Sequence, residues 1–460
     1  MFTGAGTSGA YQAGVIRALQ EAGVKIDLVA GHGMGAVVAM FAATDGGARL
    51  WEAGGLWRHR RVARFYRWRP RIRWIALATS AALSVVLVPL AVLGLGLLSY
   101  PLAFLLGVAG LDSGRSIVAG YSRVVTTVFE PSFLPEVLPR ALVLSLTALV
   151  GVLALSLLVL LFNGRGGRTD RRPLWWRILG SPLDASRVVD HFERGLWRLV
   201  GGAAHTTLPS DPEFCRGYAE LLSENLGQPG FRELVVAVHD LDTRRDLVFA
   251  MLSERHRRDF FQRRGGGGER RMAETVDLAG VGRHHVLDAL RGALVLPVAT
   301  EPHVMKFEPE SYWRGESHRV VDRPGAVGRV LAEVESAGAE QVIVVSAFAE
   351  VGGPHALGAL RDGGRRRLGE YLSAVEVSAF RDAIGTWKGR FKALFEIRPA
   401  YNPLGPLDFR GRFDEQSDRW FELAELVDRG YEDAYRQFID PVVAASGDGL
   451  GAARGESARK

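Results

Sequence analysis

The sequence predicts an α/β fold, a mostly parallel sheet between layers of helices, interrupted by an inserted transmembrane helical hairpin. Short apolar segments typical of strands alternate with segments whose apolar residues recur at helical spacing, which favours a parallel sheet covered on both faces. Two long uncharged apolar blocks separate the first of these units from the rest. A chain of 460 residues is long enough for one large α/β domain together with membrane spans.

The soluble elements are expected on both sides of the apolar blocks. Before the blocks, a Gly-rich turn at 4–9 precedes a helix over 10–22, a strand over 26–30, a tight turn at 31–35 and a helix over 36–43. After the blocks, the apolar spacing predicts helices over 186–199, 213–225, 286–294 and 420–438. It also predicts strands over 234–238, 247–251 and 341–346.

The apolar blocks, 74–111 and 141–162, carry no charged residue. A bilayer core of roughly 30 Å needs about 20 helical residues, so the second block fits one span. The first block is too long for one straight span and contains Pro89 and Pro101. It is therefore expected to form either a span with an interfacial or re-entrant piece, or a helical hairpin. A buried helix pair in a soluble protein is the alternative, but an uncharged run of this length disfavours it.

The flanks of the blocks are rich in arginine. The positive-inside rule places both flanks in the cytoplasm and the segment 112–140 outside, which requires an even number of crossings, with two favoured. The interleaved aromatic residues suit the aromatic belt of a membrane interface. Arginines that abut spans are expected to meet anionic lipid headgroups rather than nucleic acid. The arginines concerned are Arg58, Arg60, Arg61, Arg64, Arg67, Arg69, Arg71, Arg73, Arg165, Arg168, Arg171, Arg172 and Arg177, and the aromatic residues are Trp57, Phe65, Tyr66, Trp68, Trp74, Trp175 and Trp176.

The expected organisation has four parts. Residues 1–57 and 181–443 form one α/β domain, 58–180 form the inserted membrane region, and 444–460 form a disordered tail rich in Gly, Ala and charged residues. The chain begins in a Gly-rich turn rather than in a signal peptide, and the domain is expected on the cytoplasmic side of the cell membrane. Protein partners and oligomeric state are left open.

Composition excludes several kinds of site. The net charge of +6 comes mostly from arginine, and the single cysteine, Cys215, is expected to pack in a helix. Adjacent His284 and His285 lack metal-ligand spacing, so neither a metal nor another cofactor is expected. The four-glycine loop within 263–271 is basic; it is either solvated or in contact with lipid headgroups.

The segment from Gly4 to Gly9 fits the pattern GxGxxG at the start of a helix. A dinucleotide site also needs a preceding strand and an acid at the end of the second strand, about 20 residues on. Only Met1 and Phe2 precede the turn, and Asp27 lies at the wrong end of the second strand. A nucleotide-binding enzyme is therefore the weakest alternative.

The segment from Gly31 to Gly35 follows a strand and opens a helix, which is the arrangement of a nucleophile elbow, G-x-S-x-G. Here the motif is G-H-G-M-G. With the Gly-rich loop before it, this arrangement resembles the patatin-like phospholipase family. The series continues with Ala237–Arg244, where the family carries A-T-D-L-x-T-G, with a helix ending at Pro297, and with Val320–Ala326, where it carries its catalytic Asp in D-G-G or D-G-A.

The resemblance implies a patatin-like three-layer fold and a serine–aspartate dyad that cleaves lipid esters, with backbone N–H groups of the Gly-rich loop holding the oxyanion. It assigns the oxyanion loop to Gly4, Ala5, Gly6 and Gly9, the elbow glycines to Gly31 and Gly35, and the dyad aspartate to Asp322. The nucleophile position falls on Gly33, so the serine is absent. Ala5, Ser8 and Arg323 also depart from the family's pattern, while Asp240 and Asp242 match its strand-end motif and are expected to be structural.

We therefore expect a membrane protein of lipid metabolism that binds phospholipid or another acyl ester, with catalysis impaired because Gly33 has no side chain. The alternative is an active lipid esterase that uses Ser8, His32 or a water activated by Asp322. Whether the chain is an enzyme stays open at this point.

Overall fold

The computed structural model describes residues 1–132, 134–162, 180–202, 207–262, 273–349, 363–414 and 416–444. The basic loop within 263–271, the tail from 445 and the arginines and tryptophans of 165–177 lie outside these ranges. The chain forms two compact units, one made of Met1–Arg67 and Asp184–Lys460 and the other of Trp68–Leu183. The short strands β3 (Arg67–Trp68) and β4 (Leu183–Asp184) lie where the chain passes from one unit to the other.

The insertion begins ten residues later than the expected boundary at 58. The reason is that Val62, Phe65 and Tyr66 are buried in the first unit and hold their segment there. Trp57 is buried as well. The expectation that Trp57, Phe65 and Tyr66 belong to a membrane aromatic belt is therefore wrong, whereas Trp68 and Trp74 are exposed.

The first unit is built on one nine-stranded sheet whose main order is β11-β10-β1-β2-β5-β6-β7. Neighbours are parallel from β11 to β5 and between β6 and β7, while β5–β6, β5–β9 and β8–β9 are antiparallel. The mostly parallel α/β sheet is thus confirmed. The strands are β1 (Phe2–Thr3), β2 (Leu28–His32), β5 (Glu233–Asp240), β6 (Arg245–Met251), β7 (Ala273–Asp277), β8 (His303–Lys306), β9 (Ser317–Val321), β10 (Gln341–Ser346) and β11 (Ala393–Ile397).

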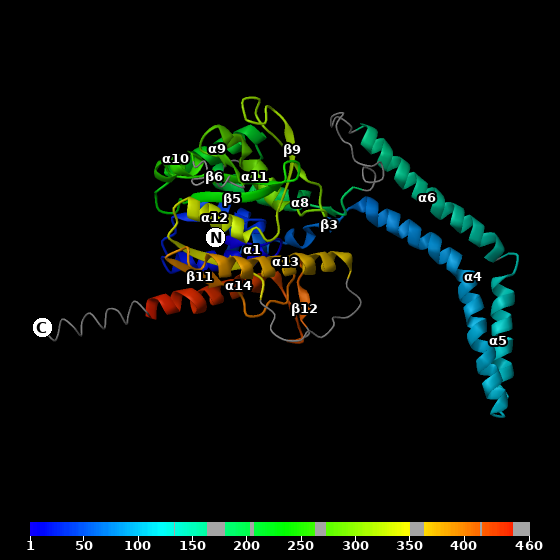
Figure 1. The fold of residues 1–460 in the computed structure, drawn as a ribbon. Coiled ribbons are helices and arrows are strands. Elements are labelled where there is room, and N and C mark those ends of the chain that lie inside the picture. Colours follow the sequence, from blue (N-terminus) through cyan, green and yellow to red (C-terminus); the bar gives the residue numbers. More distant parts are fainter. Residues whose placement is uncertain are drawn as a thin grey trace, which may run out of the picture. The chain divides into compact units, whose positions relative to one another are not determined.

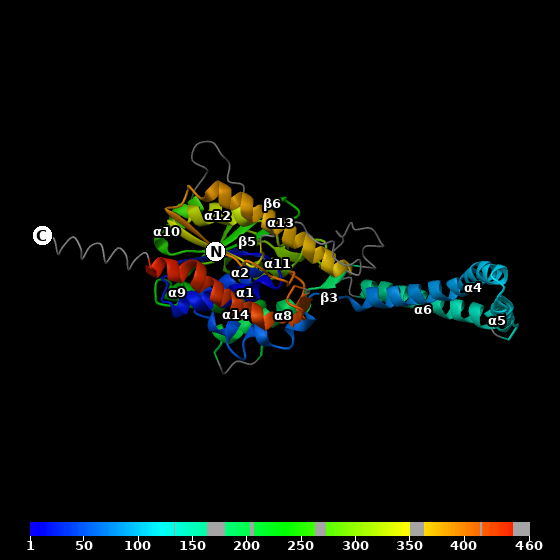
Figure 2. The same cartoon turned by 90° about the horizontal axis from the view of Figure 1, so that it is seen from below.

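Helices cover both faces of this sheet (Figure 2). On one face, apolar residues of α10 (Glu254–Gln262), α12 (Val327–Ser336) and α13 (Gly364–Trp387) pack into a core shared with β2, β5, β6 and β10. The opposite layer contains α1 (Ser8–Glu21), α2 (Met34–Ala43), α8 (Ser186–Val200), α9 (Asp211–Asn225) and α14 (Leu423–Ala434). Helix α11 (Val286–Leu294) packs against α2 and β5. The remaining short elements are α3 (Ala48–Trp51), η1 (Leu56–Arg58), η2 (Val62–Arg64) and η3 (Val281–His285).

The predicted elements appear with shifted ends, and one prediction is partly wrong. Trp420, expected in a helix over 420–438, lies in β13 (Arg419–Phe421), which pairs with β12 (Arg412–Asp414). The helix starts only at Leu423, because Glu422 and Glu425 form a capping box there. After Ala434 it continues as a π-helix to Ile439.

Helices α1 and α14 approach closely because glycines face each other's backbone. A Cβ atom at Gly14 would lie 1.8 Å from the carbonyl oxygen of Val427, and one at Gly430 would lie 2.0 Å from that of Tyr11. The buried Tyr11 hydroxyl donates to Asp433 at 3.0 Å across the same contact. This packing fixes α1, and with it the Gly-rich loop that precedes α1.

The second unit consists of α4 (Pro70–Val108), α5 (Ser113–Val128) and α6 (Leu134–Phe162) (Figure 1). Two of its helices, over Pro70–Val108 and Pro135–Leu155, are long and apolar enough to cross a membrane. The first apolar block forms one continuous helix of 39 residues with Pro89 and Pro101 inside it, not a hairpin. At about 1.5 Å per residue its length of about 58 Å exceeds a bilayer core.

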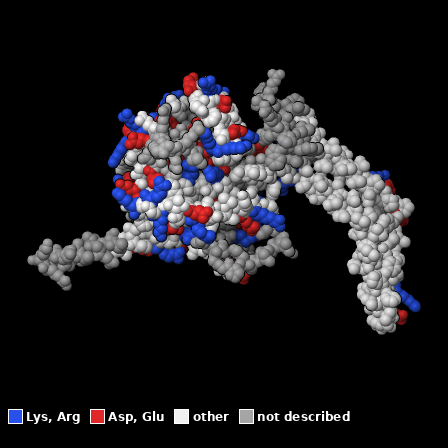
Figure 3. All heavy atoms as spheres, viewed as in Figure 1, with Lys and Arg blue, Asp and Glu red and all other residues white. Residues whose placement is uncertain are grey.

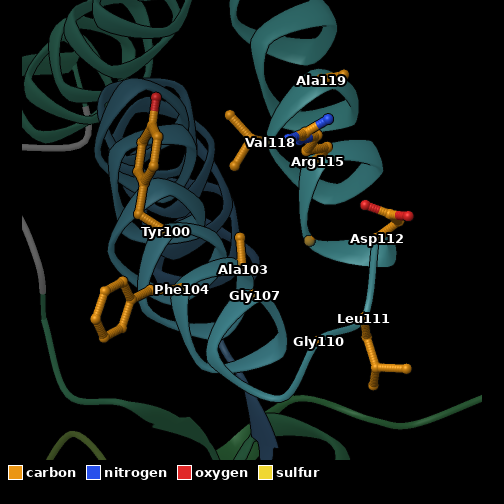
Figure 4. Close-up of a pocket in the computed structure, with 11 residues that line it drawn as sticks. Tyr100, Ala103, Phe104, Gly107, Gly110, Leu111, Asp112, Arg115, Val118 and Ala119 are labelled. Atoms are coloured by element: carbon orange, nitrogen blue, oxygen red, sulfur yellow. The ribbon is translucent and has the colours of Figure 1, made fainter.

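Helix α5 occupies part of the segment expected to be a loop between the spans. It packs on the end of α4, where a Cβ atom at Gly114 would lie 2.6 Å from the carbonyl oxygen of Ala103. A cavity of about 650 Å³ lies between these two helices, with Tyr100 and Phe104 on α4 and Arg115 and Val118 on α5 (Figure 4).

Candidate active site

The tight turn between β2 and α2 has the strand–turn–helix geometry that the motif predicted. Gly33 lies between the last residue of β2 and the first of α2, with φ 57° and ψ −135°, a conformation that side chains rarely adopt. A Cβ atom at Gly31 would lie 2.5 Å from the backbone of Gly35, and one at Gly35 would lie 2.3 Å from the carbonyl oxygen of Phe2. Both flanking positions therefore require glycine, because strand, turn and helix pack backbone to backbone.

Asp322 faces this turn. It follows β9, and its backbone N–H donates to the carbonyl oxygen of Val295 at 2.9 Å. A Cβ atom built on Gly33 would lie 2.8 Å from Oδ2 of Asp322. The structure thus brings together the two positions to which the family resemblance assigns the dyad, although they are far apart in the sequence.

The Gly-rich loop lies next to the turn, and protein atoms already use its hydrogen-bonding groups. The carbonyl oxygen of Gly4 accepts from the N–H groups of Met34 at 2.9 Å and Gly35 at 3.4 Å. These are the first free N–H groups of α2, where a helix favours negative charge. The N–H of Thr7 donates to the carbonyl oxygen of Pro406 at 2.9 Å.

Pro406 belongs to a segment, residues 402–409, that covers the Gly-rich loop and is called the cap segment below. A Cβ atom at Gly6 would lie only 1.8 Å from the carbonyl oxygen of Pro406, so the two backbones are in direct contact. The Thr7 hydroxyl donates to the carbonyl oxygen of Gly405 at 2.9 Å. The cap segment therefore packs directly on the backbone of the Gly-rich loop at Gly6 and Thr7.

The cap segment is itself firmly held. Its residues Leu404, Leu407 and Phe409 are buried. Asn402 donates to the carbonyl oxygen of Ala347 at 2.8 Å, and Arg365 donates to that of Leu407 at 2.6 Å. Burial lowers the pKa of Arg365, with Arg410 and Arg67 adding to the effect.

The candidate site is closed to solvent. The exposed fraction is 0% for Ser8 and His32, 1% for Asp322 and 2% for Ala5. A lipid ester could reach Gly33 only if part of the surrounding protein moved.

His32, which the alternative hypothesis names as a possible catalytic residue, lies between two buried carboxyl groups. Its Nδ1 is 3.5 Å from Oδ1 of Asp322, and its Nε2 is 3.7 Å from Oε2 of Glu376 on α13. Burial raises the pKa of Glu376 to about 7. Burial lowers the pKa of His32, but Glu376 and Asp322 outweigh it and hold that pKa above its ordinary value.

Glu376 was missed by sequence reasoning, although α13 carries a signal for it. Leu372, Glu376, Phe380 and Ile384 recur every four residues along the helix, and all four are buried. An acid on an otherwise apolar helical stripe requires a buried partner. Nothing near 376 identifies that partner, because His32 lies more than 300 positions earlier.

Arg323, which departs from the family's glycine, anchors the Asp322 turn. Its guanidinium pairs with Asp246 on β6, which also accepts from His239 at 2.9 Å and Arg329 at 3.2 Å. Burial opposes ionisation of Asp246, but His239 and Arg323 outweigh it and hold its pKa below the ordinary value. The turn is thus attached to the sheet by the residue after Asp322.

The remaining predicted residues have local roles. Asp240 accepts from the backbone of Asp242 at 2.9 Å and from His318 at 2.7 Å, and Asp242 pairs with Arg319, so both acids hold the β5–β6 turn against β9. Ser8 is buried, and its hydroxyl makes no hydrogen bond to the described part of the chain.

Neither a metal site nor a reactive cysteine is found among the described residues. His285 pairs with Asp288 at 2.7 Å, and no group of three His, Cys, Asp or Glu side chains in the described ranges could hold a metal ion. Cys215 is buried on α9, and burial raises the pKa of its thiol to about 11. It packs as predicted.

The fold and the turn agree with the α/β architecture and the strand–turn–helix motif that the sequence predicts. The model of the patatin-like phospholipase family matches residues 1–149. The resemblance drawn from the motifs is therefore confirmed for this part of the chain, which holds the Gly-rich loop and the turn at Gly33. Asp322 lies beyond the matched residues, so its role stays a prediction. No curated protein matches the chain.

Proposed function

We propose that this chain is a membrane-tethered patatin-like protein that binds phospholipid or another acyl lipid with little or no ester hydrolysis. The observation that carries the proposal is Gly33 in the turn that faces Asp322, where the family places its nucleophile. Without an Oγ atom at this position, the family's acyl-enzyme cannot form. Loss of a nucleophile lowers kcat by orders of magnitude, although binding alone can leave a residual rate.

The closed geometry of the site supports the same proposal. The Thr7 N–H and the first N–H groups of α2 bond to Pro406 and Gly4 rather than facing open space. A group that stabilises an oxyanion has to be free to meet it. Asp322 faces His32 at 3.5 Å, so the aspartate already has a basic partner within the protein.

The membrane tether is supported by α4 and α6, which are long and apolar enough to span a bilayer. Arg71 and Arg73 lie at the start of α4, and on the positive-inside rule they place the patatin-like unit in the cytoplasm, next to anionic headgroups. Extraction of native membranes tests this part. Retention of the protein after high-salt and alkaline washes is expected, and release by salt alone would overturn the tether.

The lack of hydrolysis is tested with the purified full chain. We expect neither turnover of phospholipid or short-chain acyl esters above an Asp322→Asn control nor labelling by a fluorophosphonate probe. Labelling of the unaltered chain at any serine would refute the proposal.

A second candidate, an esterase with an unusual nucleophile, is favoured by one observation. The Ser8 hydroxyl is buried beside the Gly-rich loop without a hydrogen bond to the described residues. This enzyme would need the cap segment to move away. Labelling that disappears in Ser8→Ala, but not in a variant at the exposed Ser223, would select this candidate.

A further inference from the structure

Residues 57–66, the last part of the patatin-like unit before α4, are packed against the unit rather than forming a free linker. Trp57 and Phe65 contact Phe192, with ring centroids 5.4 and 5.9 Å apart, and the Tyr66 hydroxyl donates to the carbonyl oxygen of Leu294 at 2.7 Å. These anchors fix the backbone of residues 57–66. The arginines between them, Arg60, Arg61 and Arg64, are exposed.

Two further arginines from distant parts of the sequence join these three. Helix α8 lies against this segment, since the ring of its His191 is 5.6 Å from that of His59, and Arg198 lies two helical turns after His191 on the same helix. Burial lowers the pKa of His191 to about 4, with Arg61 and Arg198 adding to the effect. The Nε of Arg410 donates to the carbonyl oxygen of Ala63 at 3.5 Å. The resulting surface is called the basic face, and it consists of Arg60, Arg61, Arg64, Arg198 and Arg410.

The basic face carries charge that the protein does not neutralise. Its five guanidiniums form no ion pair with an acid in the described ranges, whereas the neighbouring Arg58 and Arg194 pair with Asp428 at 3.0 Å and Asp190 at 3.4 Å. On the face of the unit that Figure 3 shows, positive and negative side chains are interspersed. Unpaired guanidiniums held on a rigid surface favour binding to phosphate groups.

We propose that the basic face binds the phosphate headgroups of an anionic lipid surface. The proposal rests on the membrane tether proposed above. Pro70, the first residue of α4, lies only six positions after Arg64, and six extended residues reach at most about 20 Å. The face is therefore held near any bilayer that α4 enters, where anionic lipid attracts basic side chains.

Hydrogen–deuterium exchange of the full chain in nanodiscs tests the proposal. We expect slower exchange in residues 57–66 and in α8 when phosphatidylcholine discs contain phosphatidylglycerol, and loss of this protection at high salt. The double variant Arg61→Gln/Arg198→Gln should lose the protection. The matched control Arg255→Gln/Arg258→Gln removes the same charge from α10, which lies at the other end of the sheet from α8 in both views (Figures 1 and 2), and should keep it.

Each of the other possible results of this experiment refutes either the membrane tether or the lipid binding of the basic face. A chain that does not enter nanodiscs refutes the tether and the proposal with it. A chain that enters them but exchanges equally in both lipid compositions, or a control pair that loses protection as the double variant does, refutes the basic face alone. Stronger protection by RNA than by phosphatidylglycerol at the same ionic strength would assign the face to nucleic acid instead.

Discussion

Nδ1 of His32 lies 3.5 Å from Oδ1 of Asp322, and neither side chain is exposed to solvent. Glu376 approaches the other ring nitrogen at 3.7 Å, so one imidazole lies between two buried carboxyl groups. In a low dielectric, two carboxylates without a cation between them repel strongly. His32 is therefore expected to hold together β2, the Asp322 turn and α13.

His32→Gln should destabilise the patatin-like unit by about 3–5 kcal/mol, because the substitution leaves two buried carboxyl groups without their basic partner. Chemical denaturation of the detergent-solubilised chain measures this loss. The double variant His32→Gln/Glu376→Gln should recover part of the stability, giving a non-additive cycle. Additive effects would mean that His32 and Glu376 do not interact.

Stability should fall as pH rises from about 4.5 to about 7, because burial raises the pKa of Glu376 from 4.5 to about 7. A carboxyl with a raised pKa keeps a proton in the folded state that the unfolded chain releases, so each rise in pH favours unfolding until the folded pKa is passed. His32, whose pKa is also raised, contributes stability that is lost in the same direction, above pH 6.5. Glu376→Gln should remove roughly 3 kcal/mol of the change in the free energy of unfolding over this pH range. Thermal unfolding of the variant and of the unaltered chain measures this difference. If Glu376 were not responsible, the melting temperatures of both proteins would depend equally steeply on pH.

Gly33→Ser alone should not create an active hydrolase. Its Cβ atom would lie 2.8 Å from Oδ2 of Asp322 and 2.9 Å from the carbonyl oxygen of Gly4, and the site would still be buried. Gly33→Ala introduces the same Cβ without a hydroxyl, so both variants should lose a similar amount of stability, about 1–3 kcal/mol. Fluorophosphonate labelling of the serine variant but not of the alanine variant would show that the site opens and that the turn can present a nucleophile.

Gly6→Ala should displace the cap segment, because its Cβ atom would lie 1.8 Å from the carbonyl oxygen of Pro406. We expect a loss of more than about 2 kcal/mol and faster proteolysis within residues 402–409. Gly23→Ala is the matched control, since Gly23 has a similar φ of 69° and no atom within 4 Å of its Cβ position. Equal losses in the two variants would attribute the effect to backbone conformation rather than to the cap segment.

The turn at Gly33 could be predicted from the sequence because its constraints are local. At Gly31 and Gly35 the backbones of β1, β2 and α2 come so close together that only glycine fits. Asp322 was found through the family's order of motifs and not through any local pattern. Sequence reasoning missed the cap segment because Pro406 lies 400 positions from Gly6, and nothing around Pro406 marks it as a partner of the loop.

One prediction failed because burial depends on tertiary contacts. Trp57, Phe65 and Tyr66 sit among arginines before a span, as interfacial residues do, yet they contact Phe192 and Phe409 inside the unit. The prolines of the first apolar block did not break its helix. Proline is tolerated inside apolar spanning helices, where neighbouring groups satisfy the freed carbonyl groups.

Strand β1 pairs with β2 on one side and with β10 on the other, so Phe2 meets a partner at Val345. During synthesis at about 5–20 residues per second, roughly 20–70 seconds separate these two residues. The apolar helices of the second unit leave the ribosome within that interval. The amino-terminal strands and the turn at Gly33 must therefore wait, without their partners in β10 and at Asp322, until the chain beyond the second unit has been made.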